Sequence, residues 1–214
     1  MRLILVRHGR TTSNVGLVLD TAVPGADLDE AGRAQAEALV ERLAAFPVEA
    51  IFTSDLVRTQ QTAAPFARAR ALEFTVLPGL REIPAGEDEM SPDAARYIGT
   101  LIKWHSGDLA ARIPGGEDAA EFFARYDAAI AEVAAGGHRV AMVVSHGAAL
   151  RTWATARVPG FVEALGKGHL DNTGIIIVDG TPEAGWQLFE LDGVRTWWMP
   201  EDAEQGDPGP GDDN

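Results

Sequence analysis

The chain has 214 residues, enough for one domain or one domain with an insertion, and no cysteine, which excludes disulfides, iron–sulfur clusters, thiolate nucleophiles and cysteine zinc sites. Its 18 lysines and arginines stand against 32 aspartates and glutamates, which gives a formal net charge of −14. Such an acidic body disfavours nucleic acid or an anionic membrane as a partner over a broad surface.

The first expected strand ends in a charged motif. Leu3 to Val6 is an apolar run, and Arg7, His8 and Gly9 follow it where a buried strand would reach the surface. In open α/β sheets, ligands bind beyond the carboxyl ends of the strands. Charge appears too early for a secretory signal, and the sequence has no apolar stretch of about 18 residues that could span a membrane. We therefore expect a cytoplasmic protein without membrane contact.

Further apolar runs predict the remaining strands. Short runs bounded by glycine, proline or polar residues predict buried strands at Ile51-Phe52, Phe74 to Leu77, Val140 to Val144 and Ile175 to Val178. The run from Trp186 to Leu191 alternates more and indicates an edge strand.

Three stretches between these runs have helical spacing. One follows Asp29, a suitable N-cap, with apolar residues at 36, 39, 40 and 43. A second begins at Ser91-Pro92, a cap followed by proline at the first helical position. Its apolar side is predicted to consist of Ile98, Leu101 and Ile102. A third has apolar residues between Phe122 and Val133 and ends at Gly136-Gly137.

This alternation predicts an α/β fold, a three-layer α/β/α sandwich with a mostly parallel central sheet. Residues 79–121 show no clear strand and are predicted to form a helical insertion over the C-terminal edge of the sheet. We expect one domain over residues 1–199, with Trp197-Trp198 pinning its end to the body. Residues 200–214 are acidic and rich in glycine and proline, so we expect a disordered tail.

A second histidine repeats the arrangement found at residue 8. The apolar run Val140 to Val144 is followed directly by Ser145, His146 and Gly147. Two histidines are thus expected at the tips of two strands.

A series of motifs in a fixed order carries a family resemblance. They are Arg7-His8-Gly9-Arg10-Thr11 followed by Asn14, Leu28 to Gly32, Ser54 to Thr62, Leu80-Arg81-Glu82 with Gly86 and Glu89, Gly115-Gly116-Glu117, and Ser145-His146-Gly147. In this order the motifs resemble the histidine phosphatase superfamily, the phosphoglycerate mutase-like enzymes, from about residue 2 to beyond residue 174. The resemblance implies an enzyme of the phosphatase branch that hydrolyses a small phosphorylated metabolite.

The resemblance also implies catalytic roles for five residues. His8 would attack phosphorus as a neutral imidazole and form a phosphohistidine. Arg7 and Arg58 would bind the phosphoryl oxygens and disfavour protonation of His8. His146 would donate to the same oxygens, with a protonation state that the sequence leaves open. Glu82 would protonate the leaving alkoxide and then activate water.

Four further residues are expected to bind phosphate. Gly9 and Gly147 would let the backbone come close to the anion, with helix N-termini after both strands offering N–H groups. Asn14 resembles the amide with which the family contacts phosphate. Thr11 would add a hydroxyl donor, or would only orient the loop.

The loop that bears Glu82 leaves one alternative open. Glu87, Asp88 and Glu89 lie close enough along the chain to compete for the role of acid. Family members often carry an aromatic residue in place of Asp88 and a glycine in place of Met90, so the conformation of this loop is not implied by the resemblance.

Residues outside these roles receive mostly structural interpretations. Arg10, at the variable position of the first motif, has an open role and would extend the positive pocket of Arg7 and Arg58. Within the insertion, helix packing is favoured over pocket lining for Tyr97, Trp104 and His105, with Lys103 facing solvent. Arg125 and Arg151 are interpreted as surface or ion-pair residues.

The scheme requires no cofactor and no metal. The sequence has no HExxH motif or carboxylate cluster, and clustered arginines would repel a divalent cation. A phosphoglycerate mutase-type phosphotransferase is the main alternative, and the acidic stretch Ile83 to Glu89, which lacks a tyrosine, favours hydrolysis. A non-catalytic phosphate-binding module and a phosphoprotein phosphatase are the others. The expected partner is a small phosphorylated substrate, bound by a monomer or homodimer.

Overall fold

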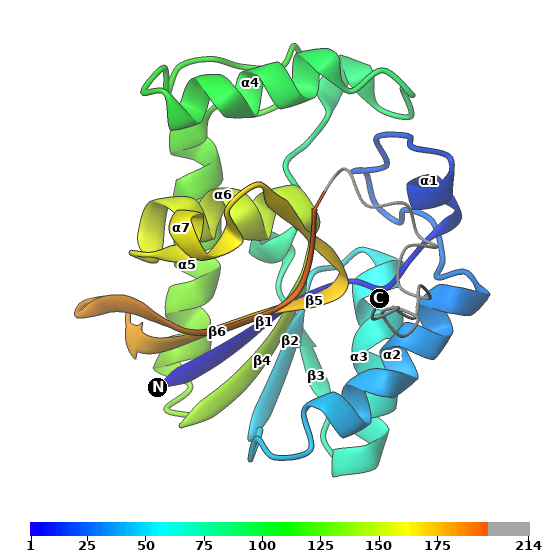
Figure 1. The fold of residues 1–214 in the computed structure, drawn as a ribbon, viewed down its shortest axis with the longest axis vertical. Coiled ribbons are helices and arrows are strands. Elements are labelled where there is room, and N and C mark those ends of the chain that lie inside the picture. The colour runs from blue at the N-terminus through cyan, green and yellow to red at the C-terminus, as the bar shows by residue number, and fades with distance from the viewer. Residues whose placement is uncertain (197–214) are drawn as a thin grey trace, which may run out of the picture.

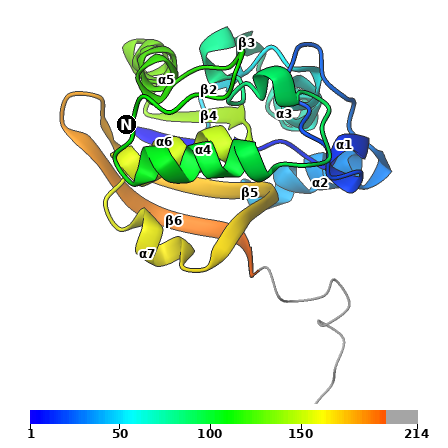
Figure 2. The same ribbon diagram turned by 90° about the horizontal axis from the view of Figure 1, so that it is seen from above.

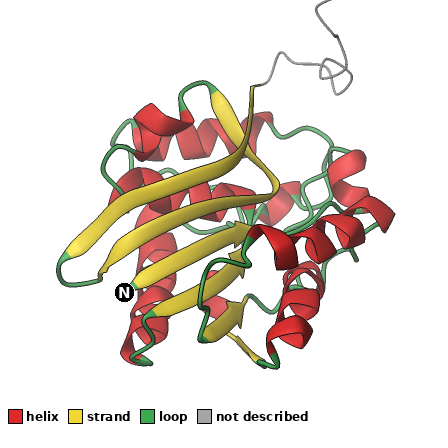
Figure 3. Ribbon diagram, turned by 60° about the horizontal axis from the view of Figure 1, so that its bottom comes forward, coloured by secondary structure: helices red, strands yellow, loops and turns green. Residues whose placement is uncertain are grey.

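The computed structural model describes residues 1–196, which form a six-stranded sheet with the strand order β3-β2-β4-β1-β5-β6 (Figures 1 and 3). The strands are β1 (Arg2–Arg7), β2 (Ala50–Thr53), β3 (Phe74–Val76), β4 (Val140–Ser145), β5 (Gly168–Thr181) and β6 (Gly185–Thr196). Strands β1 to β4 pair in parallel, whereas β5 is antiparallel to both β1 and β6. The predicted α/β fold with a mostly parallel sheet is confirmed, and β6 is the expected edge strand.

Helices cover both faces of the sheet (Figures 1 and 2). Helices α2 (Glu30–Arg42) and α3 (Val57–Arg70) lie on one face, and α5 (Ala119–Ala135) and α6 (Gly147–Arg157) lie on the other. The remaining helices are α1 (Thr12–Val15), α4 (Ala95–His105) and α7 (Phe161–Leu165), with two 3₁₀ turns at Pro78–Leu80 and Gly86–Asp88. Asp29 caps α2 as predicted, because its carboxylate accepts from the Gly32 amide at 2.7 Å.

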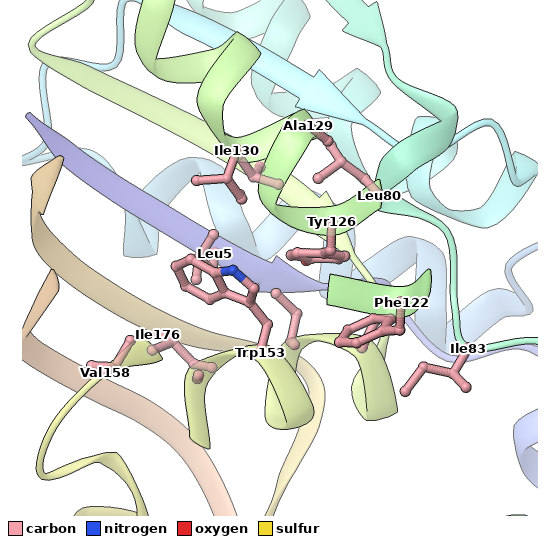
Figure 4. Packing of buried hydrophobic residues seen from close by; sticks show 14 of the residues in the cluster. Leu5, Leu80, Ile83, Phe122, Tyr126, Ala129, Ile130, Trp153, Val158 and Ile176 are labelled. Carbon is pink, nitrogen blue, oxygen red and sulfur yellow. The ribbon is translucent and has the colours of Figure 1, made fainter. Parts of the chain in front are cut away.

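The central strand β1 joins the two halves of the core. Its side chains alternate between faces, so Leu3 and Leu5 pack in the cluster beneath α5 and α6, whereas Ile4 and Val6 pack in the cluster beneath α2 and α3. All four are fully buried. Figure 4 shows the aromatic centre of the first cluster, where Phe122, Tyr126 and Trp153 stand beside Leu5. This double burial fixes the strand whose tip carries His8.

The helix within residues 79–121 differs from the prediction at both its start and its buried face. It begins at Ala95, and Ser91 instead accepts from the Asp93 amide at 3.0 Å in a turn ahead of the helix. Of the three residues predicted to form the apolar side, Leu101 packs against the core, whereas Ile98 is 50% exposed and Ile102 is 59% exposed. The buried side of the helix carries the larger aromatic residues Tyr97 and Trp104, and both donate hydrogen bonds to backbone carbonyls.

Two expectations from the sequence concern residues that the structure does not describe. Trp197-Trp198 and the tail at 200–214 lie outside the described residues. Within residues 1–196, no helix is long and apolar enough to span a bilayer.

Candidate active site

The two motif histidines stand at the tips of neighbouring strands. Strands β1 and β4 pair in parallel with Arg7 opposite Ser145, and the His8 amide continues the ladder by donating to the Ser145 carbonyl at 3.0 Å. The imidazole centroids of His8 and His146 are 5.3 Å apart, and both rings are buried. The register of the sheet therefore sets the spacing of the pair.

His8 has the tautomer and charge of a nucleophile. Its Nδ1 lies 2.7 Å from the Gly9 carbonyl, which can only accept, so the ring proton resides on Nδ1 and the lone pair on Nε2. Burial and the nearby Arg58 and Arg7 guanidinium groups hold the pKa of His8 well below its ordinary value. The ring is consequently neutral near pH 7.

The buried Arg58 and the partly buried Arg7 present buried donor atoms that no group in the described part of the chain satisfies. Arg7 Nη1 donates to the Leu170 carbonyl at 2.7 Å, and Arg58 Nη2 donates to the Asp20 carbonyl at 2.8 Å. Among the described residues, Arg7 Nε and Arg58 Nε and Nη1 are buried without a hydrogen-bond partner. Leaving a buried charged donor unsatisfied costs more than about 1–3 kcal/mol, and these donors converge beside His8. The arrangement is suited to an anion with several oxygens.

These groups line a small pocket of about 150 Å³. Its walls include seven of the residues singled out by sequence, namely Arg7, His8, Thr11, Asn14, Arg58, Glu82 and Gly147. Gly9 and His146, which were expected to touch phosphate, are not among the residues that line it.

His146 is fully buried next to His8. Its Nε2 is 2.8 Å from the Ser54 hydroxyl, and its Nδ1 is buried with no partner among the described residues. Burial, and next the charge of Arg58, hold its pKa well below the ordinary value, so this ring is also neutral. If Ser54 donates to Nε2, the proton of the neutral ring is on Nδ1 and is free for a ligand.

The first turn of α6 holds Glu82 instead of a phosphate. One carboxylate oxygen accepts from the Ala149 amide at 2.7 Å and from Ile83 at 2.9 Å, and the other accepts from Ala148 at 3.0 Å. A helix N-terminus favours such a negative group. The expectation that this helix offers unpaired N–H groups to phosphate is therefore corrected for Ala148 and Ala149, whose amides position the carboxylate in the pocket.

The other carboxylates of this loop have different partners. Asp88 pairs with Arg96, and Glu87 is 3.9 Å from the same guanidinium. Glu89 accepts from the amides of Thr21 and Ala22 at 2.8 and 3.0 Å. Of the four competing carboxylates, all of them in the described part of the chain, Glu82 is the one that lines the phosphate pocket.

The two motif glycines serve close packing. The Gly9 amide donates to Thr62 Oγ1 at 2.9 Å, and a Cβ at this position would lie 2.6 Å from the Gly32 carbonyl oxygen. Gly9 thus admits the first turn of α2, and its N–H is not available to phosphate, contrary to expectation. A Cβ at Gly147 would lie 3.0 Å from Arg7 Nε, so this glycine makes room for the guanidinium.

Thr11 and Asn14 order the loop after β1. Each side chain bonds the backbone amide of the other, at 3.2 and 3.1 Å, which forms a capping box on α1. The Asn14 oxygen also accepts from Asn172 at 3.2 Å. Both predicted residues border the pocket, and the Asn14 Nδ2 group is the donor that remains for a ligand.

Arg10 does not join the positive pocket that sequence suggested. Its Nε donates to Asp29 at 2.8 Å, and its side chain is 40% exposed. The ion pair attaches the first motif to the cap of α2, so the role left open by sequence is structural. Arg125 is an ion-pair residue as interpreted, bonded to Glu117, and it also donates to the Glu82 carbonyl at 3.0 Å.

Sequence reasoning missed Asp20 and undervalued Tyr97. The Asp20 carboxylate lies 3.7 Å from Arg58 Nη1 and accepts from Ser13 and Ala26 at 2.8 and 2.9 Å. Nothing in the irregular loop around it signals a pocket residue. Tyr97 packs in the core as expected, with its hydroxyl 3.0 Å from the Ile83 carbonyl, and it lines the pocket as well.

Comparison with known proteins decides the family. The family model described as histidine phosphatase superfamily (branch 1) matches residues 3–191. The chain belongs to this superfamily. Both the sequence resemblance and the prediction of a histidine phosphatase-type enzyme are thereby confirmed. Among the described residues there is no group of three or more metal-ligating side chains that could hold a metal ion.

Individual relatives and structures agree with this family. The chain is 38% identical over 209 residues to the PE-PGRS family protein PE_PGRS11 of Mycobacterium tuberculosis, covering 88% of this chain but only 36% of that protein. It is 33% identical over 159 residues to a probable phosphoglycerate mutase, GpmB, of Yersinia enterocolitica, covering 70% and 71% of the two chains. The structure of a mycobacterial glucosyl-3-phosphoglycerate phosphatase in complex with VO3 matches with a TM-score of 0.74 at 27% identity, over 91% of this chain and 99% of the other.

Proposed function

We propose that this protein is a phosphomonoesterase that hydrolyses a small phosphorylated metabolite through a phosphohistidine on His8. The observation that carries the proposal is the neutral His8 ring, protonated on Nδ1, beside guanidinium donors that lack hydrogen-bond partners within residues 1–196. A nucleophile and a preformed site for oxygens that gain charge are the two requirements of phosphoryl transfer.

The first step forms the phosphoenzyme. His8 Nε2 attacks phosphorus, the bond from phosphorus to the ester oxygen breaks, and Glu82 gives its proton to that oxygen to release the alcohol. Arg7 and Arg58 stabilise the charge on the remaining phosphoryl oxygens, and His146 can donate to them from Nδ1.

The second step restores the enzyme. The Glu82 carboxylate takes a proton from water, the hydroxide oxygen bonds to phosphorus, and the bond from phosphorus to Nε2 breaks. Inorganic phosphate leaves, and His8 and Glu82 return to their starting protonation states. The backbone donors at Glu82 keep the carboxylate within the pocket throughout both steps.

Transfer to water is favoured over return of the phosphoryl group to substrate. The cations that line the phosphate pocket are Arg7 and Arg58, both of which face the position of the transferred group. Neither is left over for the second phosphate or carboxylate of a mutase substrate. The similarity to a solved phosphatase supports the same choice, whereas the similarity to GpmB keeps phosphoglycerate mutase activity as the alternative.

The test combines product analysis with trapping of the intermediate. Purified protein is given ³²P-labelled phosphoglycerates, sugar phosphates and aryl phosphates, quenched in base, and mapped for acid-labile, base-stable label. We expect inorganic phosphate as product and label on the peptide that contains residue 8. EDTA should leave the rate unchanged because no step uses a metal.

The variant His8→Gln should show neither label nor turnover while keeping the wild-type melting temperature. Full activity in this variant would overturn the mechanism. Isomerised phosphoglycerate without phosphate release would identify a mutase, and phosphate binding without turnover of any substrate would identify a non-catalytic module.

A further inference from the structure

A second cleft continues directly from the phosphate pocket. Its volume is about 350 Å³, and it shares Arg7, Tyr97, Gly147 and Ala148 with the smaller pocket. Its lining residues come from α4, from the first turns of α6 and from the start of β5. Figures 1 and 2 show where these three elements lie in the fold. The alcohol part of a substrate whose phosphoryl group lies at His8 would therefore lie next to this cleft.

Aliphatic residues make up most of the wall that α4 contributes. Ile98, Leu101 and Ile102 line the cleft together with Tyr97 and His105 of the same helix, and Leu170 of β5 lines it as well. The two isoleucines are 50% and 59% exposed, although the opposite side of the same helix is anchored in the core by Tyr97 and Trp104. The orientation of α4 therefore leaves an apolar surface uncovered beside the reaction site.

The exposed surface of the cleft is mainly apolar. No aspartate or glutamate is among its lining residues in the described chain, where its polar members are Arg7, Tyr97, His105, Arg151, Thr152 and His169. A sugar or a polyol would place hydroxyl groups against the aliphatic wall and lose hydrogen bonds to water. An alkyl or aromatic group would instead bury its own apolar surface and the apolar surface of the cleft, and both would be removed from water.

We propose that the preferred substrates are phosphate monoesters of alcohols with an apolar alkyl or aromatic body, and that Ile98 and Ile102 select them. This inference rests on the proposed phosphatase function and names its substrate class. The occupant of the cleft is the alcohol half of the substrate, because the cleft opens onto the pocket from which that half must leave.

A homologous series of straight-chain primary alkyl phosphates tests the proposal. Ethyl, butyl and hexyl phosphate have leaving alcohols of nearly equal acidity, so the chemistry is constant while apolar length increases. In the wild type, kcat/KM should rise about fourfold for each added methylene until the cleft is filled. Glycerol phosphate should resemble ethyl phosphate or fall below it.

The double variant Ile98→Asn/Ile102→Asn should flatten this dependence, so that kcat/KM for hexyl phosphate falls toward the value for ethyl phosphate. Both side chains are already half exposed, so the fold should survive, as a thermal melt would verify. Val162→Asn on α7 is the matched control, because Val162 is 51% exposed and does not line the cleft. This control should keep the wild-type slope.

The possible failures can be told apart. A wild-type enzyme that hydrolyses the series with a flat or falling slope, or a slope that survives in the double variant, would overturn the apolar subsite but not the phosphatase. Failure to hydrolyse any member of the series and p-nitrophenyl phosphate as well would overturn the proposed function.

Discussion

The phosphate pocket and the apolar cleft are neighbours with opposite construction. The pocket is bordered by residues at the tips of two central strands and by the buried Arg58, so its geometry follows from the register of the sheet. The cleft is bounded by α4, one side of which is anchored while the other remains exposed. On the functions proposed above, the pocket would bind the phosphoryl group common to all substrates and the cleft would distinguish their alcohols.

Among the predicted effects that distinguish the pocket from the cleft, we expect the largest loss of activity when the proposed proton donor, Glu82, is changed. Glu82→Gln should lower kcat/KM for alkyl phosphates about 10²- to 10⁴-fold, because their alkoxide leaving groups need a proton. Aryl phosphates leave without that help and should retain much of their phosphorylation rate, measured as a burst of phenol.

The control for this variant is Glu89→Gln, whose side chain binds the Thr21 and Ala22 amides and should show no dependence on the leaving group. Equal losses on alkyl and aryl substrates in Glu82→Gln would mean that the substitution only disturbs the first turn of α6. Leaving-group dependence in the Glu89 variant instead would move the acid to that residue.

Arg58→Ala should slow phosphorylation about 30- to 1000-fold, since a charge-assisted contact in a desolvated site is worth roughly 2–4 kcal/mol. Arg58→Lys should recover little, because an ammonium cannot reproduce the planar fork of donors. The rates of both variants can be measured by steady-state kinetics on an aryl phosphate. Near wild-type activity of Arg58→Lys would show that only the charge at this position matters.

The buried imidazoles should make stability depend on pH in a defined window. Both histidines have folded pKa values below the unfolded value of about 6.5, so the unfolded chain binds more protons as the pH falls through that value. The free energy of unfolding should therefore decrease below about pH 6.5, at up to roughly 1.4 kcal/mol per pH unit for each ring.

Urea unfolding in phosphate-free buffer between pH 5.5 and 7.5 measures this slope. His8→Gln should remove about half of the pH dependence of the unfolding free energy that the two buried histidines produce. His105→Gln, at an exposed residue of α4, is the control variant in the same measurement. A slope that does not differ between wild type and His8→Gln would show that the buried ring is not kept neutral by folding.

The smallest effect is expected at Arg10, which provides a charge-matched control for Arg58. Arg10→Gln removes the same unit of charge, but its ion pair with Asp29 is partly exposed to solvent and contributes about 0–1 kcal/mol to stability. Activity should stay within about twofold of wild type in the same kinetic assay. A loss comparable to that of Arg58→Ala would place Arg10 in the substrate site after all.

The parts of the molecule that sequence predicts well are those in which one local pattern determines the structure. The continuous apolar runs of β1 and β4 can only be buried strands, and the residues after them must reach the edge of the sheet. The family motifs then bring Arg7, His8, Arg58 and Glu82 to one pocket, as expected.

Sequence fails where tertiary packing chooses between equivalent local options. On α4, both the isoleucine side and the aromatic side are apolar, and the hydrogen bonds of Tyr97 and Trp104 decide which is buried. Gly9 illustrates the same limit, because its neighbour Gly32 comes close only in the folded chain. The extent of β5 was also underestimated, since an irregularity between Leu170 and Ile175 accommodates polar residues within the strand.

The hydrogen bond from the His8 amide to Ser145 has a consequence for how the enzyme loses activity on heating or in denaturant. That amide lies at the end of the two central strands, and its exchange with deuterated solvent requires β1 and β4 to separate at this end of the sheet. Amides of α4 can exchange through local opening, since one side of that helix faces solvent. Selectivity among substrates should therefore fade under milder conditions than phosphoryl transfer itself.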